Sequence, residues 1–513
     1  MSKNYKSSTI YLLICGIILF PIIYFPYSLD LSVFALCGKT IANGGKLYVD
    51  IIDIKTPAIY YFFSFIHSLT NSNEIGLRIF DYFWQLTTVF IIRITVLKIS
   101  KDSMASFFSG ILYSFSYTTL NYTCTTQAES FIALPMLLIL HVFLLDNKSI
   151  LNKLILGILF GLVISLKITF GVIVIPFLLD IISQNNLSNK NKIWFILTVF
   201  LFALGTFLFT FTPLLDKEVF SAYIVMNKFL IAYIKHPPYD LELIKSFIKN
   251  TGTFIGENYS LVFSFFLVLG VFSISQSKEI ILKFLKLNFM LFLFMIFSVV
   301  IEKKFFQYHY SRFYLFTSIL CGFGISLVVS TIKNNSLQFN LFNKVLITII
   351  FILSLFLSPI SRYINILQPI YLFYTDKSKY YHFFDSKEIN NCHLVSEKEV
   401  VEYLKVYYKP SEKVDVISVG GNTINMMLNN PRFSPLIQSC FFYSDGVPYE
   451  YLRLYQINLL SSDWLIFATK DIFLYKNKSS WDYLINDTTN YQYVIDNFEM
   501  VKEVPAYKVF KRK

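Results

Sequence analysis

The sequence predicts a polytopic α-helical membrane protein with a small extracytoplasmic α/β domain at its C-terminal end. Of the 513 residues, 55% are hydrophobic and only 15% are charged, whereas globular chains carry about 25% charged residues. Apolar runs of about 20 residues, the length that crosses a bilayer, recur along residues 1–375. In residues 376–513, charged residues, Asn and Ser become frequent, and the residue pattern is that of a soluble domain.

The first apolar run is predicted to be a membrane span that leaves the cytoplasm. Lys3 and Lys6 precede it, and basic residues near a span end favour the cytoplasmic side. Residues 7–29 are uncharged and no small-residue cleavage site follows them, so the run does not have the pattern of a cleaved signal peptide.

Apolar length and flanking lysines together predict about eleven spans. Because this number is odd, a cytoplasmic N-terminus places the C-terminus outside. The predicted spans are residues 9–28, 77–97, 104–120, 129–145, 154–168, 170–183, 193–215, 259–275, 286–301, 310–331 and 343–362.

Two outer loops are long enough to carry structure of their own. Residues 29–75 form the first, and within it Pro57–Thr70 is apolar but too short for a full span, which favours an interfacial or re-entrant helix. Residues 216–257 form the second, with an apolar middle.

The C-terminal part shows the signals of an independent α/β domain. Ser396 with Glu399 three residues later is typical of a helix capping box. Residues 414–421 and 464–469 are predicted strands, and residues 501–513 are predicted to form a terminal hairpin. The segment is long enough to have its own core.

The net charge of +12 is explained by the positive-inside distribution of lysines in short loops. Nucleic-acid binding is disfavoured because the chain has no compact basic domain. The six cysteines show neither CxxC nor zinc spacing. Cys392 and Cys440 could pair if their domain is extracytoplasmic.

Ionisable residues gather at the predicted outer surface, where their cost beside an apolar bundle makes them functional candidates. Asp30 follows the first span, and Glu129 begins the fourth. The rest of the group lies between them in the first outer loop, and its members are Asp50, Asp53, Lys55 and Tyr60.

These residue types suit the transfer of a group from a lipid phosphate to an acceptor outside the membrane. A carboxylate near hydrocarbon can act as a general base toward a hydroxyl, and an interfacial lysine can hold a phosphate. A second carboxylate could share a divalent ion with Asp30 or orient the acceptor. The simpler alternatives stay open: Asp30 and Glu129 as helix-end acids, and Lys55 as a lysine that only extends to the interface.

The first outer loop resembles that of the GT-C glycosyltransferases related to dolichyl-phosphate-mannose protein mannosyltransferases and the bacterial lipid A aminoarabinose transferase. Asp30 matches the first acid of that loop. Gly45-Lys-Leu-Tyr48-Val-Asp50 matches its middle, and Asp53-Ile-Lys55-Thr56-Pro57 matches its end. The chain departs from the pattern at Leu31, which replaces a frequent second acid, and at Thr56, which replaces a proline.

Further positions extend the resemblance over the membrane region. Glu129 matches an acid early in the fourth span, where many members have Asp, and Lys167 ends a Gly-rich span. His309 and Arg312 lie in a segment similar to a late outer-edge motif.

The resemblance implies an inverting glycosyltransferase that uses a polyprenyl-phosphate monosaccharide. Asp30 would be the general base, with Glu129 as a second catalytic acid and the two as tentative ligands of a divalent metal ion, the one cofactor expected. Lys55, Lys167 and Arg312 would neutralise the lipid phosphate. The expected partners are the donor, a lipid, glycan or protein acceptor and the membrane. The expected location is the bacterial inner membrane, with the site on its extracytoplasmic face.

Two alternatives remain. A polysaccharide polymerase or ligase is expected to have arginine-rich outer loops, and here the outer loops carry few arginines. A lipid-linked sugar transporter or flippase is expected to have charges in the middle of its spans and internal repeats, whereas here the charges gather at the outer surface and no repeat is visible.

Overall fold

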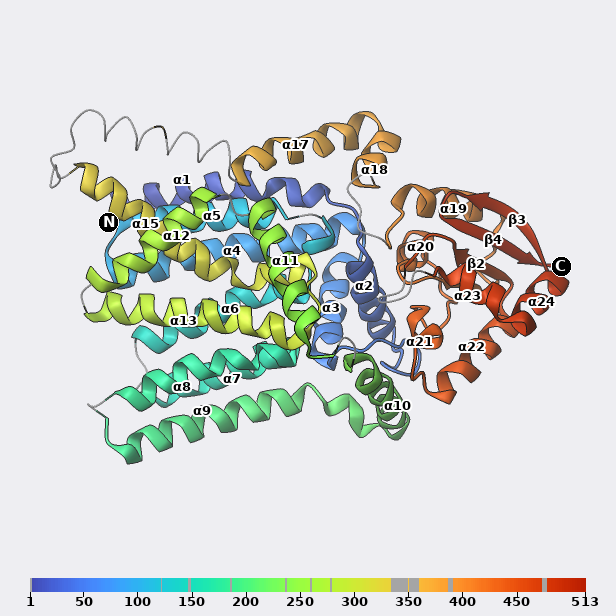
Figure 1. The fold of residues 1–513 in the computed structure, drawn as a ribbon, viewed down its shortest axis with the longest axis horizontal. Helices are drawn as coiled ribbons and strands as arrows, with labels where there is room; N and C mark the ends of the chain where they lie inside the picture. The colour runs from blue at the N-terminus through green and yellow to red at the C-terminus, as the bar shows by residue number, and fades with distance from the viewer. Residues whose placement is uncertain are drawn as a thin grey trace. The chain divides into compact units, whose positions relative to one another are not determined.

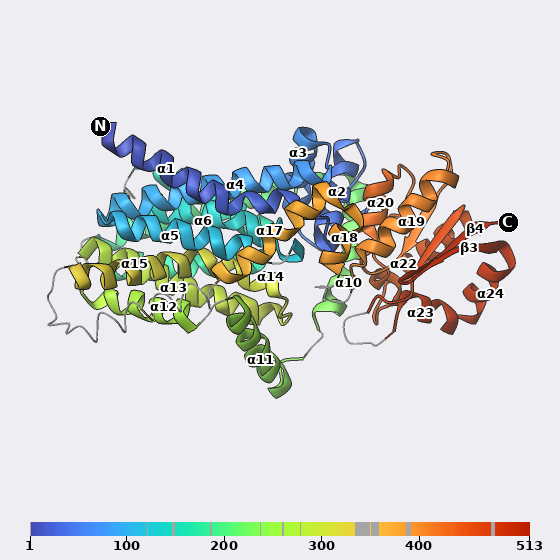
Figure 2. The same cartoon turned by 90° about the horizontal axis from the view of Figure 1, so that it is seen from above.

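The computed structural model is mostly helical, with one small sheet (Figures 1 and 2). The chain divides into two compact units. We call them the helical unit (Met1–Phe25, Arg78–Thr210 and Tyr239–Ile370) and the mixed unit (Pro26–Leu77, Phe211–Pro238 and Tyr371–Lys513). The structure describes residues 2–120, 122–145, 149–184, 187–235, 238–258, 261–276, 279–333, 349, 359–385, 391–472 and 478–513.

Long helices lie side by side in the helical unit (Figure 1). Within it, α5 and α12 pack on α15, and α7 packs on α9. The helices are α1 (Ser2–Leu19), η1 (Phe20–Tyr24), α4 (Glu74–Ser100), α5 (Ser103–Thr118), η2 (Tyr122–Cys124), α6 (Ala128–Leu145), α7 (Ile150–Leu166), η3 (Ile168–Ile173), α8 (Val174–Ser183), α9 (Asn189–Phe209), α11 (Leu241–Asn258), α12 (Leu261–Phe272), η5 (Ser273–Gln276), α13 (Glu279–Glu302), α14 (Gln307–Tyr310), η6 (Ser311–Phe313), α15 (Tyr314–Lys333) and α17 (Pro359–Thr375). The first residues of α4 and the last of α17 belong to the mixed unit.

Each of the first ten predicted spans overlaps one described helix or a run of consecutive ones. The eleventh, residues 343–362, lies mostly outside the described residues. Four described helices are long and apolar enough to cross a membrane: Glu74–Ser100, Asn189–Phe209, Glu279–Glu302 and Gln307–Thr331. The polytopic helical class is therefore confirmed, while the number of spans and their orientation stay predictions.

Local sequence explains where several helices start and stop. The Asp102 carboxylate caps α5 by accepting the backbone N–H groups of Met104 and Ala105, both at 2.9 Å. Lys167 ends α7 with an extended backbone (φ −162°, ψ 120°) before the 3₁₀ helix η3 begins. This break leaves the lysine in a non-helical link inside an otherwise apolar segment.

The mixed unit contains the one described sheet, with strand order β1-β2-β4-β3. Strand β1 is parallel to β2, and the other neighbours are antiparallel. Val414, Trp464, Ile466 and Val509 are fully buried in its core. The elements are α2 (Leu29–Ala42), α3 (Pro57–Thr70), η4 (Thr212–Leu215), α10 (Lys217–Ile234), α18 (Lys377–Asp385), α19 (Leu394–Tyr407), β1 (Val414–Ile417), α20 (Asn422–Leu428), α21 (Cys440–Tyr443), α22 (Tyr449–Ser461), β2 (Trp464–Ala468), α23 (Ser480–Asn486), α24 (Thr488–Asn497), β3 (Phe498–Val504) and β4 (Tyr507–Arg512).

The predicted strands and terminal hairpin are confirmed as β1, β2 and the β3–β4 pair, but the predicted capping box is wrong. Helix α19 begins at Leu394, which is fully buried. Ser396 therefore lies inside the helix and is not its N-cap. Its start is held by Glu397, whose Oε1 accepts the His393 backbone N–H at 3.1 Å. The possible Cys392–Cys440 disulfide is not formed, and both residues are thiols.

The sequence did not predict that residues 26–77 and 211–238 pack with the C-terminal part. Figure 1 shows α2 between α3 and α20. The Ile52 backbone N–H donates to the Pro435 carbonyl at 2.9 Å. At Gly420, a Cβ would lie 1.8 Å from the Asn391 carbonyl and 3.2 Å from Leu29. Glycine is therefore the residue that lets the Asn391 carbonyl approach this turn, and it also leaves room for the Leu29 side chain of α2.

Candidate active site

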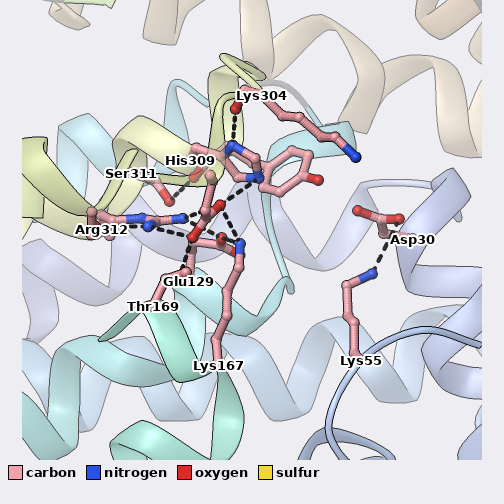
Figure 3. Close-up of polar contacts among 12 residues, drawn as sticks. Asp30, Lys55, Glu129, Lys167, Thr169, Lys304, His309, Ser311 and Arg312 are labelled. Atoms are coloured by element: carbon pink, nitrogen blue, oxygen red, sulfur yellow. Dashed lines mark hydrogen bonds and ion pairs between the residues drawn. The ribbon is translucent and has the colours of Figure 1, made fainter. Parts of the chain in front are cut away.

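Asp30 lies in the first turn of α2, in the mixed unit. Ser28 precedes the helix in an extended conformation, and the N–H groups at a helix start favour a negative charge nearby. The Asp30 side chain is 14% exposed, and its Oδ1 lies 3.8 Å from Lys55 Nζ (Figure 3). The predicted base is therefore reachable and lies beside a predicted cation. We call these two residues the Asp30–Lys55 pair.

Two tyrosines fix the backbone of Lys55. The Tyr48 hydroxyl donates to the Lys55 carbonyl at 2.8 Å, and the Lys55 N–H donates to the Tyr60 hydroxyl at 2.9 Å. The Tyr60 hydroxyl in turn donates to Asp53 Oδ2 at 2.7 Å. Burial, together with the negative charge of Asp53, raises the pKa of Tyr60 well above its usual value, so the hydroxyl stays a donor. Tyr48 has a φ of +68°, a strained conformation for a non-glycine residue.

Lys55 Nζ lies between two carboxylates, 3.8 Å from Asp30 and 4.0 Å from Asp53. Both distances are longer than a direct hydrogen bond. The Lys55 side chain is 25% exposed, whereas that of Asp53 is 2% exposed, so Asp53 supports the lysine from the buried side. An anionic group would approach Lys55 from its exposed side, opposite to Asp53.

Asp50 has a structural contact in the same loop. Its Oδ2 accepts the Lys46 backbone N–H at 2.7 Å and so closes a turn. The Lys46 ammonium pairs with Asp216 at 2.9 Å and with Glu218 at 2.8 Å. A substrate contact of Asp50 stays a prediction.

A second group of charged residues lies in the helical unit and comes from four helical segments and one break. We call Glu129, Lys167, Glu302, His309 and Arg312 the ion cluster. Glu129 is in the first turn of α6, Glu302 ends α13, and Lys167 lies in the link between α7 and η3. His309 and Arg312 lie in α14 and η6. Figure 3 shows the side chains of Glu129, Lys167, His309 and Arg312 pointing toward one another.

The two carboxylates of the ion cluster bind the same two cations. Glu129 Oε1 accepts from Lys167 Nζ at 2.7 Å and from Arg312 Nη2 at 2.8 Å. Glu302 accepts from Lys167 Nζ and from Arg312 Nη1, both at 2.8 Å, and lies 3.2 Å from His309 Nε2. Arg312 is fully buried, whereas the Lys167 side chain is 20% exposed. Four predicted site residues thus meet in one network, in which Lys167 is the most accessible cation.

Sequence reasoning missed Glu302, the acceptor that joins the cations and the histidine. Its carboxylate also accepts from the Thr169 hydroxyl. A signal was available, because Glu302 is an acid at the end of an apolar span, as Glu129 is at the start of one. The next residue, Lys303, has a φ of +57°, so the chain turns sharply directly after the carboxylate.

Sequence reasoning also missed a buried network that supports Glu129. Arg78 Nη1 donates to the Thr126 hydroxyl at 2.7 Å, and this hydroxyl donates to Asp81 Oδ2 at 2.8 Å. The Tyr117 hydroxyl donates to the same Asp81 oxygen at 2.7 Å. Thr126 has a φ of +60° and lies just before α6. The network therefore holds the strained turn that leads into the helix carrying Glu129, and an arginine and an acid within an apolar segment were its signal.

The divalent metal ion predicted on Asp30 and Glu129 stays a prediction. Among the described residues, Glu129, Glu302 and His309 form the group of three His, Cys, Asp or Glu side chains whose ligand atoms lie within 4.8 Å of one another. Two carboxylates and a histidine suit a divalent ion. Here, however, the carboxylate oxygens already accept the N–H groups of the two cations of the ion cluster. A divalent ion bound here would therefore have to share these oxygens with the two cations or displace them.

Comparison with known proteins places these residues in context. Residues 54–209 match the family model described as dolichyl-phosphate-mannose-protein mannosyltransferase, and this match includes Lys55, Tyr60, Glu129 and Lys167. A comparison with curated protein sequences gives no match.

Two similar solved structures are those of ArnT from Cupriavidus metallidurans. The apo form has a TM-score of 0.57 at 10% identity, covering 99% of this chain and 98% of that one. The form bound to undecaprenyl phosphate has a TM-score of 0.51 at 10% identity, covering 98% and 97%. The predicted resemblance is thereby confirmed, and the fold of this chain is similar to that of ArnT.

Proposed function

We propose that this chain is a membrane glycosyltransferase that moves a monosaccharide from a polyprenyl-phosphate donor to an acceptor outside the cytoplasm. The observation that carries the proposal is the Asp30–Lys55 pair, a reachable carboxylate 3.8 Å from an ammonium. Transfer from a lipid phosphate to a hydroxyl needs both a base for the hydroxyl proton and a cation for the phosphate. The match to the mannosyltransferase family over residues 54–209 supports the same reaction class.

In the proposed reaction, the Asp30 carboxylate takes the proton of the acceptor hydroxyl. The hydroxyl oxygen attacks the anomeric carbon from the face opposite to the phosphate, and the configuration is inverted. The bond between the anomeric carbon and the phosphate oxygen breaks, and its electron pair stays on that oxygen. The ammonium group of Lys55 stabilises the negative charge that develops there. Lys167, the accessible cation of the ion cluster, is proposed to hold a lipid phosphate as well.

The remaining predicted residues have supporting roles in this proposal. Glu129, His309 and Arg312 are buried. Glu129 orients Lys167 directly, and His309 and Arg312 do so through Glu302, so we assign positioning roles to them. Asp53 and Tyr60 orient Lys55. A divalent ion on Glu129 stays a proposal that would require Lys167 or Arg312 to be displaced. The donor lipid is supported by the solved ArnT, whose structure contains undecaprenyl phosphate.

The orientation proposed for this reaction has eleven spans, a cytoplasmic N-terminus and an extracytoplasmic C-terminus, in a bacterial inner membrane. It is supported by the lysines that flank the predicted spans. Labelling single cysteines introduced into residues 376–513 with a membrane-impermeant thiol reagent tests it. Labelling only after the membrane is made permeable would contradict an outside C-terminus.

The reaction itself is tested with membranes that contain the wild-type chain, Asp30→Asn or Asp496→Asn. Asp496 is an exposed carboxylate on α24 and is the matched control. Membranes are given polyprenyl phosphates carrying a radiolabelled sugar, and the label that leaves the lipid is counted. We expect transfer by the wild type and the control and its loss in Asp30→Asn at equal expression. Equal transfer by all three chains would remove Asp30 as the base.

A further inference from the structure

The ion cluster contains a balance of charge that the reaction alone does not explain. Lys167 and Arg312 contribute two positive charges, and Glu129 and Glu302 contribute two negative charges. Each carboxylate contacts both cations at 2.7–2.8 Å. A site built only for strong phosphate binding would present its cations without such neutralisation.

Burial shows which member of the ion cluster an incoming anion can reach. The Arg312 side chain is 0% exposed and that of Glu129 is 2% exposed, so both face the interior. The Lys167 side chain is 20% exposed and that of Glu302 is 9% exposed. An anion at this surface therefore meets the Lys167 ammonium, with the Glu302 carboxylate 2.8 Å behind it.

The proposed donor and product differ in the charge of this anion. A sugar-bearing polyprenyl phosphate is a phosphodiester with one negative charge, whereas the polyprenyl phosphate left after transfer is a monoester with about 1.5 to 2 negative charges at pH 7. A cation without neutralisation attracts the monoester more strongly than the diester, because the Coulomb energy grows with charge. Such a site would retain its product.

We propose that Glu302, with Glu129 behind it, neutralises Lys167 and Arg312 so that the site does not favour the doubly charged monoester over the singly charged diester. This inference rests on the proposed function and assigns Glu302 a specificity role in it. Glu302 acts through Lys167 and is a positioning residue. Its charge weakens the hold on the leaving lipid phosphate and so allows the product to depart.

The test compares the binding of two lipids that share one tail. Farnesyl phosphate is the monoester probe and farnesyl methyl phosphate is the diester probe, and neither carries a sugar. Their dissociation constants are measured on the purified full chain in detergent micelles, for the wild type, Glu302→Gln and Glu279→Gln. Glu279 is an exposed acid at the opposite end of α13 and is the matched control for the loss of one carboxylate.

We expect the wild type and Glu279→Gln to bind the two probes within about threefold of each other. Glu302→Gln leaves the two cations with one carboxylate and should prefer the monoester by about tenfold or more, since one unbalanced charge within a few ångströms of a phosphate has an effect of this size. If Glu302 had a purely structural role, Glu302→Gln would weaken the binding of both probes equally and leave the ratio of their dissociation constants unchanged. That result would overturn the inference.

If Glu302→Gln does not fold, the binding of the two probes to the wild type tests the inference by itself. A wild-type preference for the monoester of tenfold or more would overturn the inference while leaving a lipid-phosphate site in place. Binding of neither probe would overturn it together with the proposed donor class. Near-equal binding of both probes at physiological ionic strength supports it.

Discussion

Tyr60→Phe is the substitution that most directly tests how the mixed unit positions Lys55. It removes one oxygen atom and no charge. The Tyr60 hydroxyl accepts the Lys55 N–H at 2.9 Å and donates to Asp53 Oδ2 at 2.7 Å. Without this hydroxyl, the buried Asp53 carboxylate and the Lys55 backbone N–H each lose one hydrogen bond. We expect the loop that carries Lys55 to loosen and the transfer rate to fall.

The size of this effect follows from burial. Tyr60 is fully buried and the Asp53 side chain is 2% exposed, so solvent cannot replace the lost contact without rearrangement. Leaving such a group unsatisfied costs about 1–3 kcal/mol. If this cost falls on the transition state, kcat/KM decreases by about 5- to 150-fold. Any part that falls on folding instead appears as a lower melting temperature.

The assay is sugar transfer from the labelled donor in membranes, together with thermal unfolding of the purified chain. Tyr61→Phe is the matched control, because Tyr61 is the next residue on α3 and is 38% exposed. We expect the control to behave as the wild type in both measurements. A Tyr60→Phe chain with wild-type kcat/KM and wild-type melting would refute the argument that this hydroxyl fixes Lys55.

Three further predictions follow from contacts elsewhere in the chain. Asp81→Asn places an N–H donor against the hydroxyl donors of Tyr117 and Thr126. The melting temperature and the rate of sugar transfer should therefore both decrease, and an unchanged melting temperature would contradict the role of this network. Burial raises the pKa of Asp415 to about 7, above the usual Asp value of about 3.9. The folded state therefore keeps a proton that the unfolded chain loses, and stability falls as pH rises from about 4 to about 7. Asp415→Asn should remove the part of this loss that falls between pH 5 and pH 8, about 3 kcal/mol. Denaturant unfolding of the full chain at these two pH values measures it, and an unaltered pH dependence would contradict the prediction. Lys46→Ala removes ion pairs that are largely exposed, so stability should change by at most about 1 kcal/mol, and a larger loss in thermal unfolding would show that these pairs organise the loop.

The parts of the fold that local sequence determines could be predicted. Helix α3 has the predicted bounds, because Pro57 occupies its first turn and Asn71 ends it in the left-handed conformation. The terminal hairpin and the strand at Trp464 also follow from short patterns. The capping box at Ser396 failed because burial of Leu394 decided where α19 begins.

The candidate site was predictable where its residues are close in sequence or lie at span ends. Asp30, Asp53 and Lys55 belong to one loop, and their contacts need few long-range pairings. Glu302 contacts Lys167, which lies 135 positions away in the chain. No local sequence pattern predicts a contact over such a separation. Arg78 and Asp81 were missed for a related reason, because their partners belong to the turn before α6.

The packing of α2 against α20 has a consequence for exchanging parts between related proteins. The helix that carries Asp30 approaches the C-terminal part at Gly420, and Ile52 bonds to the Pro435 carbonyl. Residues 371–513 are therefore not an independent cassette, although their sequence has the character of a separate domain. A chimera that transplants this unit has to move residues 26–77, 211–238 and 371–513 together, since these three segments form one compact unit and only one of them is contiguous with the C-terminus.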